Sequence, residues 1–275
     1  MTHPALAENH VAVITGGASG IGLAAARKFE AMGLKVAIAD YRQEALDAAV
    51  AMLGPDALAL RTNVASRDDV EKLRDAVYER FGKVNVLMNN AGTDGAGPVL
   101  GSLDNWQRVI NTNLFGVVNG MQVFVPEMLN GTEPGLVINT GSKQGITTPP
   151  GDAGYNVSKA GVKVATEALA HELRNIADVR ITAHLLIPGF VWTHLTKAGR
   201  TEKPAGAWTP EQTVDFMLAS LDRGDFYILC PDNEVDRATD EKRILWAAGD
   251  VVENRPPLSR WHKDFADKFK AYLKG

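Results

Sequence analysis

Short apolar runs alternate with segments of helical periodicity along most of this 275-residue chain. The first run, at residues 11–14, leads into a glycine-rich turn, and the segment after it places Ile21, Ala25 and Phe29 on one helical face. Strands separated by helices of this length pair in parallel, with helices covering both faces of the sheet. The predicted fold class is therefore α/β, a doubly wound, Rossmann-type parallel sheet of about seven strands.

The same pattern predicts the boundaries of the elements. Strands are expected at residues 11–14, 35–40, 57–62, 84–88, 136–139, 180–187 and 225–230. Helices are expected at residues 21–32, 43–53, 66–82, 104–128, 153–176, 210–221, 234–248 and 261–273. With 45% hydrophobic residues the chain can bury one large core, so residues 1–275 are predicted to form a single dinucleotide-binding and catalytic domain.

Charge and composition narrow the classes of partner. The 29 basic and 33 acidic residues are mixed along the chain, which argues against nucleic acid or an anionic membrane as a partner. The single cysteine, Cys230, excludes an internal disulfide and fits a reducing compartment. The first ten residues do not resemble a signal peptide, and no apolar run approaches the ~18 residues of a membrane span. A cytoplasmic protein is expected. The six histidines form no ligand cluster, so no metal is expected.

One expected helix carries a tyrosine and a lysine four residues apart, Tyr155 and Lys159. Side chains at this spacing share a helical face. An ammonium at ~4 Å supplies roughly the 4 kcal/mol needed to lower a phenol pKa by about three units, and an oxidised nicotinamide would add to it. The pair can therefore make a general acid/base that works near neutral pH. Tyr-x-x-x-Lys also occurs on ordinary surface helices, so this interpretation depends on the rest of the chain.

The turn after the first strand, residues 15–22, has the glycine spacing G-x-x-x-G-x-G. Glycines there allow a backbone to approach a pyrophosphate at a helix N-terminus. Asp40 ends the second expected strand, where a carboxylate can bind a ribose 2′-hydroxyl and repel a 2′-phosphate, so NAD is favoured over NADP. Arg42 is the opposing sign, because its guanidinium can accept that phosphate. The Asn-Asn-Ala-Gly turn at residues 89–92 follows the fourth strand, where open parallel sheets bind ligands; such a turn can equally serve its own backbone.

Together these motifs resemble the short-chain dehydrogenase/reductase family. The order runs from the glycine-rich turn through Asn-Asn-Ala-Gly and a serine 13 residues before Tyr-x-x-x-Lys to Pro188-Gly189, over residues 11 to about 193. The resemblance implies Tyr155 as acid/base, Lys159 as the group that lowers its pKa and holds the nicotinamide ribose, and Ser142 as the group that orients the substrate oxygen. It also implies Asn113 as the anchor of a proton-relay water, with Asn111 as the competing candidate.

The resemblance also implies a cofactor site. The residues expected to bind the dinucleotide are Gly16, Ser19, Gly20, Ile21, Gly22, Asp40, Tyr41, Asn63, Val64, Asn90, Ala91, Gly92, Tyr155, Lys159, Pro188, Gly189, Val191 and Thr193. Asn63 departs from the family, in which relatives commonly place Asp. Substrate contacts are expected from Ser142, Gln144, Tyr155, Phe190 and Trp192. Residues 193–210 would form a substrate lid, and residues 233–275 a helical C-terminal extension beyond the point where many relatives end.

The expected reaction is NAD(H)-dependent interconversion of a secondary alcohol and a ketone, with an apolar or cyclic small molecule as substrate. Three alternatives stay open at this point: an NADP(H)-dependent carbonyl reductase, a non-catalytic cofactor sensor, and a lyase or epimerase on the same scaffold. A homodimer or homotetramer is expected. The extension would cover the substrate mouth or contact a neighbouring subunit.

Overall fold

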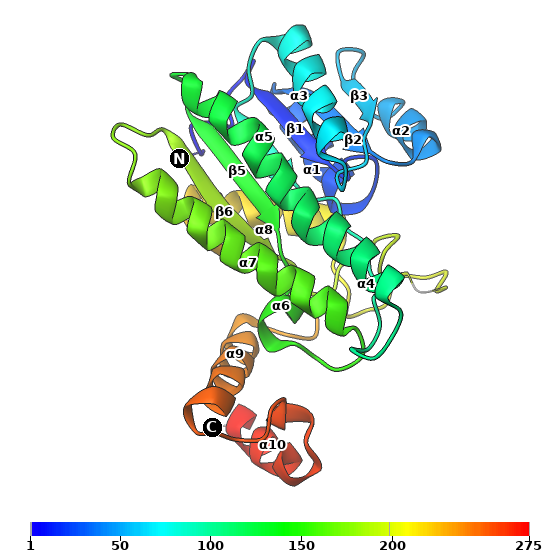
Figure 1. The fold of residues 1–275 in the computed structure, drawn as a ribbon, viewed down its shortest axis with the longest axis vertical. Helices are drawn as coiled ribbons and strands as arrows, with labels where there is room; N and C mark the ends of the chain where they lie inside the picture. The colour runs from blue at the N-terminus through cyan, green and yellow to red at the C-terminus, as the bar shows by residue number, and fades with distance from the viewer. Residues whose placement is uncertain (1, 198, 275) are drawn as a thin grey trace.

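Seven parallel strands form the centre of the protein, whose computed structural model describes residues 2–197 and 199–274 (Figure 1). Their order across the sheet is β3-β2-β1-β4-β5-β6-β7, which confirms the predicted doubly wound fold class. The strands are β1 (Val11–Thr15), β2 (Lys35–Asp40), β3 (Leu58–Arg61), β4 (Val86–Asn89), β5 (Gly135–Thr140), β6 (Ile181–Ile187) and β7 (Tyr227–Leu229).

Helices cover both faces of the sheet. The α-helices are α1 (Gly20–Ala31), α2 (Gln43–Val50), α3 (Arg67–Phe81), α4 (Leu103–Ile110), α5 (Gly116–Asn130), α6 (Gln144–Thr147), α7 (Ala153–Arg174), α8 (Pro210–Asp222), α9 (Arg237–Val252) and α10 (Ala266–Lys274). Alternate residues of β1 enter different cores: Ile14 packs with Phe29 of α1, whereas Val13 belongs to the core that contains Phe124 of α5. Burial on both faces explains why the strands are near-continuous apolar runs.

The strand order reverses between β1 and β4. β1 pairs with β2 on one side and with β4 on the other, so the chain leaves this point in opposite directions. The loops that follow the carboxyl ends of these strands diverge there and leave a crevice between them. Ligands bind at such a crevice in open α/β sheets, which places any site at this edge.

The expected single helix over residues 104–128 is interrupted. A π-helical turn, Asn111–Phe115, separates α4 from α5, and the backbone N–H of Gly116 donates to the carbonyl oxygen of Asn111 five residues earlier. Residue spacing alone predicts apolar faces but not an inserted residue in a helical turn. The short helix α6 was also not expected, because four residues are too few to show a period.

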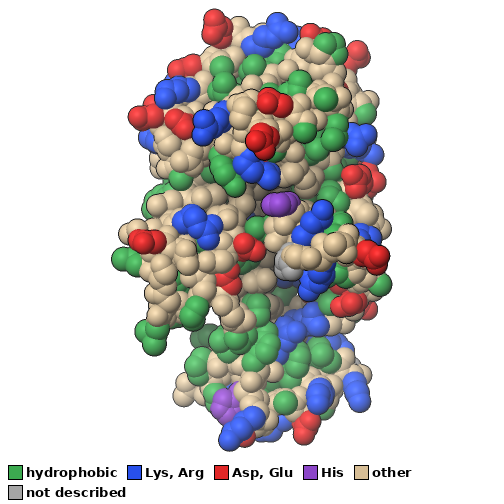
Figure 2. All heavy atoms as spheres, turned by 90° about the vertical axis from the view of Figure 1, so that its right-hand side faces the viewer, with side chains coloured by type: hydrophobic (Ala, Val, Ile, Leu, Met, Phe, Trp, Pro, Cys, Tyr) green, Lys and Arg blue, Asp and Glu red, His purple; other side chains and the backbone are tan. Residues whose placement is uncertain are grey.

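The C-terminal extension forms a small lobe that stands away from the sheet (Figure 1). Its centre is Trp246 of α9, whose ring lies 5.2 Å from those of Phe269 and Tyr272 of α10 and whose Nε1 donates to Ser259 Oγ at 2.8 Å. Figure 2 shows this lobe below the body, with hydrophobic side chains on both sides of the junction. Within the segment predicted as a lid, residues 193–197 and 199–209 form turns, bends and one bridge, at Trp208, and lead to Thr209, the N-cap of α8. Residues 1, 198 and 275 of the predicted domain lie outside the described part of the chain.

Two histidines meet at the opposite end of the sheet from the crevice. His3 Nε2 and His184 Nε2 each lie 3.0 Å from the hydroxyl of Thr182, and the two rings are 5.9 Å apart. Burial lowers the pKa of His3 to about 4, with the neighbouring His184 as a second cause, and burial also lowers the pKa of His184. Protonating either ring would therefore place a positive charge in a poorly solvated site.

We expect this pair to make the protein acid-sensitive. Because the folded-state pKa of His3 lies below the unfolded value of 6.5, its stabilising effect is complete above that pH and is lost as the pH falls toward about 4. The free energy of unfolding should fall by about 1–2 kcal/mol over that range, after discounting for partial exposure. Urea unfolding of wild-type protein and His3→Gln across this range checks it. An unchanged acid dependence in His3→Gln would contradict the assignment.

No helix within residues 2–197 and 199–274 is both long and apolar enough to cross a membrane.

Candidate functional site

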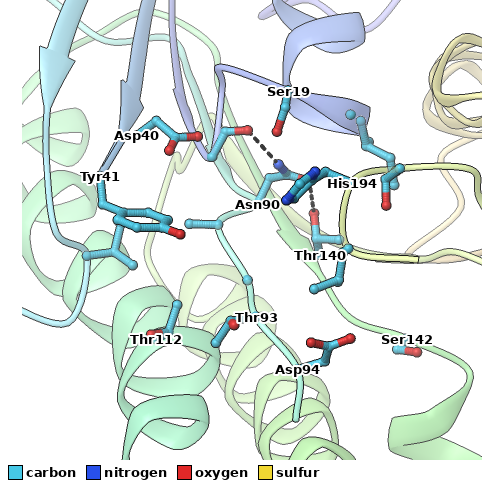
Figure 3. A pocket seen from close by; sticks show the side chains of 18 of the residues that line it. Ser19, Asp40, Tyr41, Asn90, Thr93, Asp94, Thr112, Thr140, Ser142 and His194 are labelled. Carbon is cyan, nitrogen blue, oxygen red and sulfur yellow. Dashed lines mark hydrogen bonds between the residues drawn. The ribbon is translucent and has the colours of Figure 1, made fainter. Parts of the chain in front are cut away.

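A cleft of about 1010 Å³ opens at the carboxyl ends of the strands, over the point where the strand order reverses (Figure 3). This is at the upper end of the roughly 300–1,000 Å³ that small-molecule and cofactor sites occupy. Most residues predicted to bind a dinucleotide line it: Gly16, Ser19, Gly20, Ile21, Asp40, Tyr41, Asn63, Val64, Asn90, Ala91, Gly92, Tyr155, Lys159, Pro188, Gly189, Val191 and Thr193. Residues from the loops after β1, β2, β3, β4 and β6 and from helix α7 thus meet in one place.

The glycine-rich turn packs directly against the Asn-Asn-Ala-Gly turn. Gly16 has a φ of +62°, and a Cβ on it would lie 2.8 Å from Ala91 Cα, so only glycine fits. A Cβ on Gly22 would overlap the carbonyl oxygen of Gly16. Gly22 does not line the cleft; it lets α1 begin close to the turn. The N-terminus of α1 faces the cleft at Ser19, whose side chain makes no cap hydrogen bond to the helix. The first amide groups of α1 are thus placed to bind an anion.

Asp40, at the end of β2, is 6% exposed and lies in the same cleft. Its Oδ1 accepts from the backbone N–H of Arg42 at 3.1 Å and from Arg42 Nε at 3.3 Å. The guanidinium also donates to Ser19 Oγ at 3.0 Å. Arg42 was the residue that could accept the 2′-phosphate of NADP. Its side chain is held instead by Asp40, the carboxylate expected to bind the ribose of NAD.

Asn90 ties the two turns together. Its backbone N–H donates to Thr15 Oγ1 at 3.0 Å, and its Nδ2 lies 3.3 Å from the carbonyl oxygens of Thr15 and Gly16. Thr140 donates its hydroxyl proton to Asn90 Oδ1 at 3.3 Å, which links β5 to the same turn. Asn90 therefore bonds the backbone of the glycine-rich turn rather than that of its own turn, and it also lines the cleft, where its contact with a ligand stays a prediction.

Tyr155 and Lys159 lie on one face of α7, as their spacing predicts, with Lys159 Nζ 5.8 Å from the centre of the Tyr155 ring. Asp152 caps this helix by accepting from the backbone N–H of Tyr155 at 3.4 Å. Lys159 is almost fully buried, and its Nζ donates to the carbonyl oxygen of Thr140 at 2.7 Å. Ser142 completes the group from the loop after β5.

The pKa of the tyrosine shifts in the opposite direction to the expected one. Burial raises the pKa of Tyr155 to about 12; the Ser142 hydroxyl opposes this, and the carboxylates of Asp94 and Asp152 add to it. Burial also lowers the pKa of Lys159 to about 8, so its charge is itself costly. The simple ion-pair estimate omitted this desolvation. The side chains of the protein alone therefore keep the phenol protonated at neutral pH.

Asn113 lies on the π-helical turn and is completely buried, whereas the competing Asn111 is exposed. The Oδ1 of Asn113 accepts from the backbone N–H of Thr93 at 2.7 Å, and the Nδ2 of Asn113 donates to the carbonyl oxygen of Thr93 and to Ser158 Oγ. The side chain therefore joins the loop after Gly92 to α7. It does not line the cleft.

Three residues predicted as substrate contacts do not line the cleft: Gln144, Phe190 and Trp192. Gln144 is exposed at the start of α6. Phe190 and Trp192 flank Val191, which does line the cleft, in a segment paired with Trp208. The N–H of Trp208 donates to the Phe190 carbonyl oxygen, and its carbonyl oxygen accepts from the Trp192 N–H, each at 2.8 Å. A bridge between segments this far apart in the chain has no signature in local periodicity.

Two other residues that line the cleft, Arg108 and Thr112, were not indicated by the motifs, whereas His194 belongs to the segment predicted as a lid. Arg108 of α4 reaches back to the loop after Gly92, donating to Thr93 Oγ1 at 2.7 Å and to the carbonyl oxygen of Asp94 at 2.8 Å. In the sequence it looks like a solvated helical arginine, and no local signal distinguishes it. Among the described residues, no group of three or more His, Cys, Asp or Glu could hold a metal ion.

Comparison with known proteins gives consistent matches. The family model for short chain dehydrogenases matches residues 10–204. Meso-2,3-butanediol dehydrogenase of Serratia marcescens is 38% identical over 192 residues, covering 69% of this chain and 74% of that protein. A 3-oxoacyl-(acyl-carrier-protein) reductase of Synechocystis sp. is 37% identical over 193 residues, covering 68% and 76%. The crystal structure of a short-chain dehydrogenase/reductase from Burkholderia phymatum in complex with NAD superposes with a TM-score of 0.83 at 32% identity, covering 94% of this chain and 98% of that one.

Proposed function

This chain belongs to the short-chain dehydrogenase/reductase family and is an oxidoreductase that acts on CH–OH groups, and from that premise we propose that it interconverts a secondary alcohol and a ketone with NAD(H). One observation carries the proposal: Tyr155, Lys159 and Ser142 converge in a cleft that also holds the buried carboxylate of Asp40. Proton-transfer groups beside a carboxylate suited to a nucleotide favour a reaction in which both a proton and a hydride are transferred.

The residues of the cleft fit a dinucleotide. The turn that contains Gly16 gives a backbone surface beside the N-terminus of α1, which suits a pyrophosphate. The Asp40 carboxylate suits a ribose hydroxyl pair. When bound, the nicotinamide supplies the acceptor or donor of a hydride and, in its oxidised form, a positive charge near the phenol. The relative solved with NAD supports this choice of cofactor, and the engagement of Arg42 by Asp40 favours NAD over NADP.

Within this proposal each side chain has a defined task. Tyr155 takes the hydroxyl proton during alcohol oxidation and returns it to the carbonyl oxygen during ketone reduction. Ser142 orients that oxygen through its hydroxyl group. Lys159 stabilises the phenolate and binds the nicotinamide ribose, and Asn113 holds the loop that carries Thr93 against α7. Gly22, Gln144, Phe190 and Trp192 stay predictions as ligand contacts, and so does Asn113 as the anchor of a proton-relay water.

The raised phenol pKa predicts a pH profile. Because Tyr155 is protonated in the free enzyme at neutral pH, ketone reduction finds the acid ready, whereas alcohol oxidation needs the minor phenolate form. We expect kcat/KM for oxidation to rise about tenfold per pH unit from about pH 6 to about pH 8, where Lys159 keeps its charge, with reduction nearly flat over the same range. Initial rates with a panel of secondary alcohols and ketones test this. An oxidation profile already level at about pH 7 would contradict it.

Production of NADH from NAD and a panel of secondary alcohols, including diols and cyclic alcohols, tests the function itself. The relatives are named for substrates as different as a butanediol and a 3-oxoacyl group, so the panel should span both. A cofactor sensor would bind NADH without turnover, and a lyase or epimerase would change substrate without net NADH formation. The expected homodimer or homotetramer is checked by the mass of the protein in solution.

A further inference from the structure

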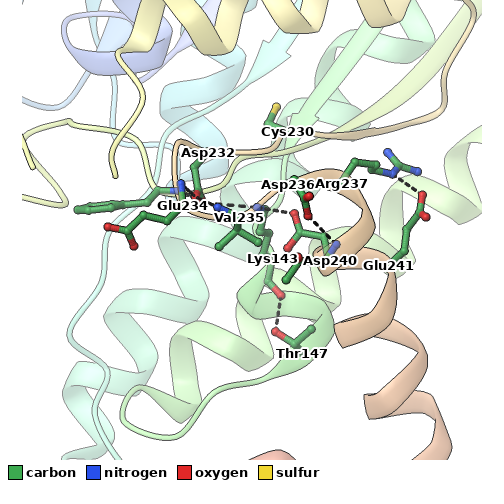
Figure 4. A network of polar contacts seen from close by, with 12 residues as sticks. Lys143, Thr147, Cys230, Asp232, Glu234, Val235, Asp236, Arg237, Asp240 and Glu241 are labelled. Carbon is green, nitrogen blue, oxygen red and sulfur yellow. Dashed lines mark hydrogen bonds and ion pairs between the residues drawn. The ribbon is translucent and has the colours of Figure 1, made fainter. Parts of the chain in front are cut away.

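Lys143, Asp232 and Asp240 form a buried ionic cluster next to the loop that carries the proposed catalytic serine (Figure 4). Lys143, the residue after Ser142, places its Nζ 2.5 Å from Asp240 Oδ2 and 3.5 Å from Asp232 Oδ2. The three side chains are 17%, 5% and 7% exposed, in the order Lys143, Asp240 and Asp232. An ion pair removed from water to this extent holds its geometry firmly, because separating the charges leaves each one poorly solvated.

The cluster joins the loops that follow three neighbouring strands. Lys143 belongs to the loop after β5, and Asp232 to the loop after β7. Asp232 Oδ2 also accepts from the backbone N–H of Phe190, in the loop after β6, at 3.2 Å. A Cβ on Gly189 would lie 2.7 Å from Asp232 Oδ2 and 3.0 Å from Lys143 Nζ. The walls of the nicotinamide end of the cleft are thus packed directly on this cluster.

Asp240 brings the C-terminal extension into the cluster. Asp236 caps α9 by accepting from the backbone N–H of Thr239 at 2.8 Å, which orients the first turn of the helix. That orientation turns Asp240 inward to Lys143 and its neighbour Glu241 outward, where Glu241 pairs with Arg237 at 2.7 Å on the exposed face. One helical turn therefore carries a buried ion pair and a solvated one side by side.

Few contacts separate Asp240 from the reacting atoms. Lys143 is bonded to Ser142, and Ser142 Oγ accepts from the backbone N–H of Gln144 at 3.2 Å. Thr147 donates its hydroxyl proton to the Lys143 carbonyl oxygen at 3.2 Å, which ties α6 to the serine loop. Anchoring the Lys143 side chain fixes the backbone from which the Ser142 hydroxyl reaches toward Tyr155.

We propose that Asp240 is a positioning residue of the active site, which acts through Lys143 to hold Ser142 in line with Tyr155. The C-terminal extension is then a support of the catalytic loop. The expected effect on turnover rests on the proposed dehydrogenase function. The expected effect on the serine loop rests on the loop contacts alone.

Asp240→Asn tests the proposal in the full-length protein, with Glu241→Gln as the matched control on the same helix. Asp240→Asn should lower kcat for alcohol oxidation about 10- to 100-fold, since sub-ångström misplacement of a catalytic group is this costly. Rates are expressed per NADH-binding site, counted by fluorescence titration, so unfolded protein does not enter. The Kd for NADH should change less than about threefold, because most of its contacts lie at the other end of the cleft. Glu241→Gln should match wild type in both.

Hydrogen exchange without cofactor or substrate provides the second readout. Amide exchange in the peptide that covers residues 141–148 should be at least about fivefold faster in Asp240→Asn than in Glu241→Gln. This result does not depend on finding a substrate, so it tests the positioning role separately from the proposed function. If no alcohol is turned over, only the proposed function is refuted. Equal exchange in the two variants, or wild-type kcat in Asp240→Asn, would overturn the positioning role.

Two further variants keep the test decisive if Asp240→Asn does not fold. Asp240→Glu keeps the negative charge and should retain most of the wild-type rate. Asp240→Asn keeps the size of the side chain but not its charge, so a slow Asp240→Asn beside a fast Asp240→Glu would assign the effect to the charge. The double variant K143M/D240L replaces the ion pair by apolar side chains, a change that often preserves stability. It should fold and bind NADH yet turn over at least about tenfold more slowly; full turnover would refute the inference.

Discussion

Replacing Tyr155 by phenylalanine is expected to lower kcat by about 10²- to 10⁴-fold, the range that a positioned proton-transfer group contributes. The ring is kept, so the packing of α7 and the 5.8 Å approach of Lys159 are retained. Only the hydroxyl group that faces Ser142 is lost. The Kd for NADH should stay within about threefold of wild type, because one hydroxyl contact is removed from a site with many. Steady-state kinetics and NADH fluorescence titration measure the two quantities.

Tyr78→Phe is the matched control for this prediction. Burial raises the pKa of Tyr78, like that of Tyr155, to about 12, but Tyr78 lies on α3 and does not line the cleft. A loss of turnover confined to Tyr155→Phe would therefore reflect the position of the phenol rather than the removal of any half-buried hydroxyl group. Turnover that survives in Tyr155→Phe would refute the mechanism.

Asp40→Ala is expected to reverse the preference between the two dinucleotides. In wild type the carboxylate occupies Arg42 and would repel a 2′-phosphate; without it, Arg42 is free to accept that group beside Ser19. A hydrogen bond from Arg42 to the phosphate would favour NADP binding by about 1.5–3 kcal/mol. Removing the negative charge of Asp40 at ~4 Å would favour it by a further amount, at most about 4 kcal/mol. The ratio of kcat/KM for NADP to that for NAD should therefore rise about 10²- to 10³-fold.

The double variant D40A/R42A separates the two causes. It lacks the repelling carboxylate but also the guanidinium, so it should lose the affinity for NAD without gaining the full affinity for NADP. An Asp40→Ala enzyme that still prefers NAD as strongly as wild type would show that other groups in the cleft select the cofactor.

Most of the sheet could be predicted because its information is local. A buried parallel strand must be apolar on both faces, and a covering helix must repeat its apolar residues about every 3.6 positions. The strands were therefore found within two residues of their ends. The π-helical turn at Asn111–Phe115 and the four-residue helix α6 were not, since neither leaves a periodic trace. The pairing of residues 190–192 with Trp208, on either side of the predicted lid, likewise has no local signal.

The candidate site divides in the same way. Asp40 and Ser142 could be placed at one edge of the sheet, because both follow parallel strands whose carboxyl ends meet there. Arg108 could not, because its contact with the loop after Gly92 depends on how α4 is seated after the chain has turned. The pairing of Lys143 with Asp240 likewise joins segments on opposite sides of β6 and β7 in the chain.

By itself, the amino-acid sequence determined the alternation of strands and helices and the shared helical face of Tyr155 and Lys159, since backbone geometry and side-chain period act over a few residues. Only the tertiary structure decided that burial raises the Tyr155 pKa, that Arg42 is held by Asp40, and that Asp240 of α9 pairs with Lys143 next to Ser142. Solvation and charge pairing depend on which distant segments surround a group, and folding alone brings those segments together.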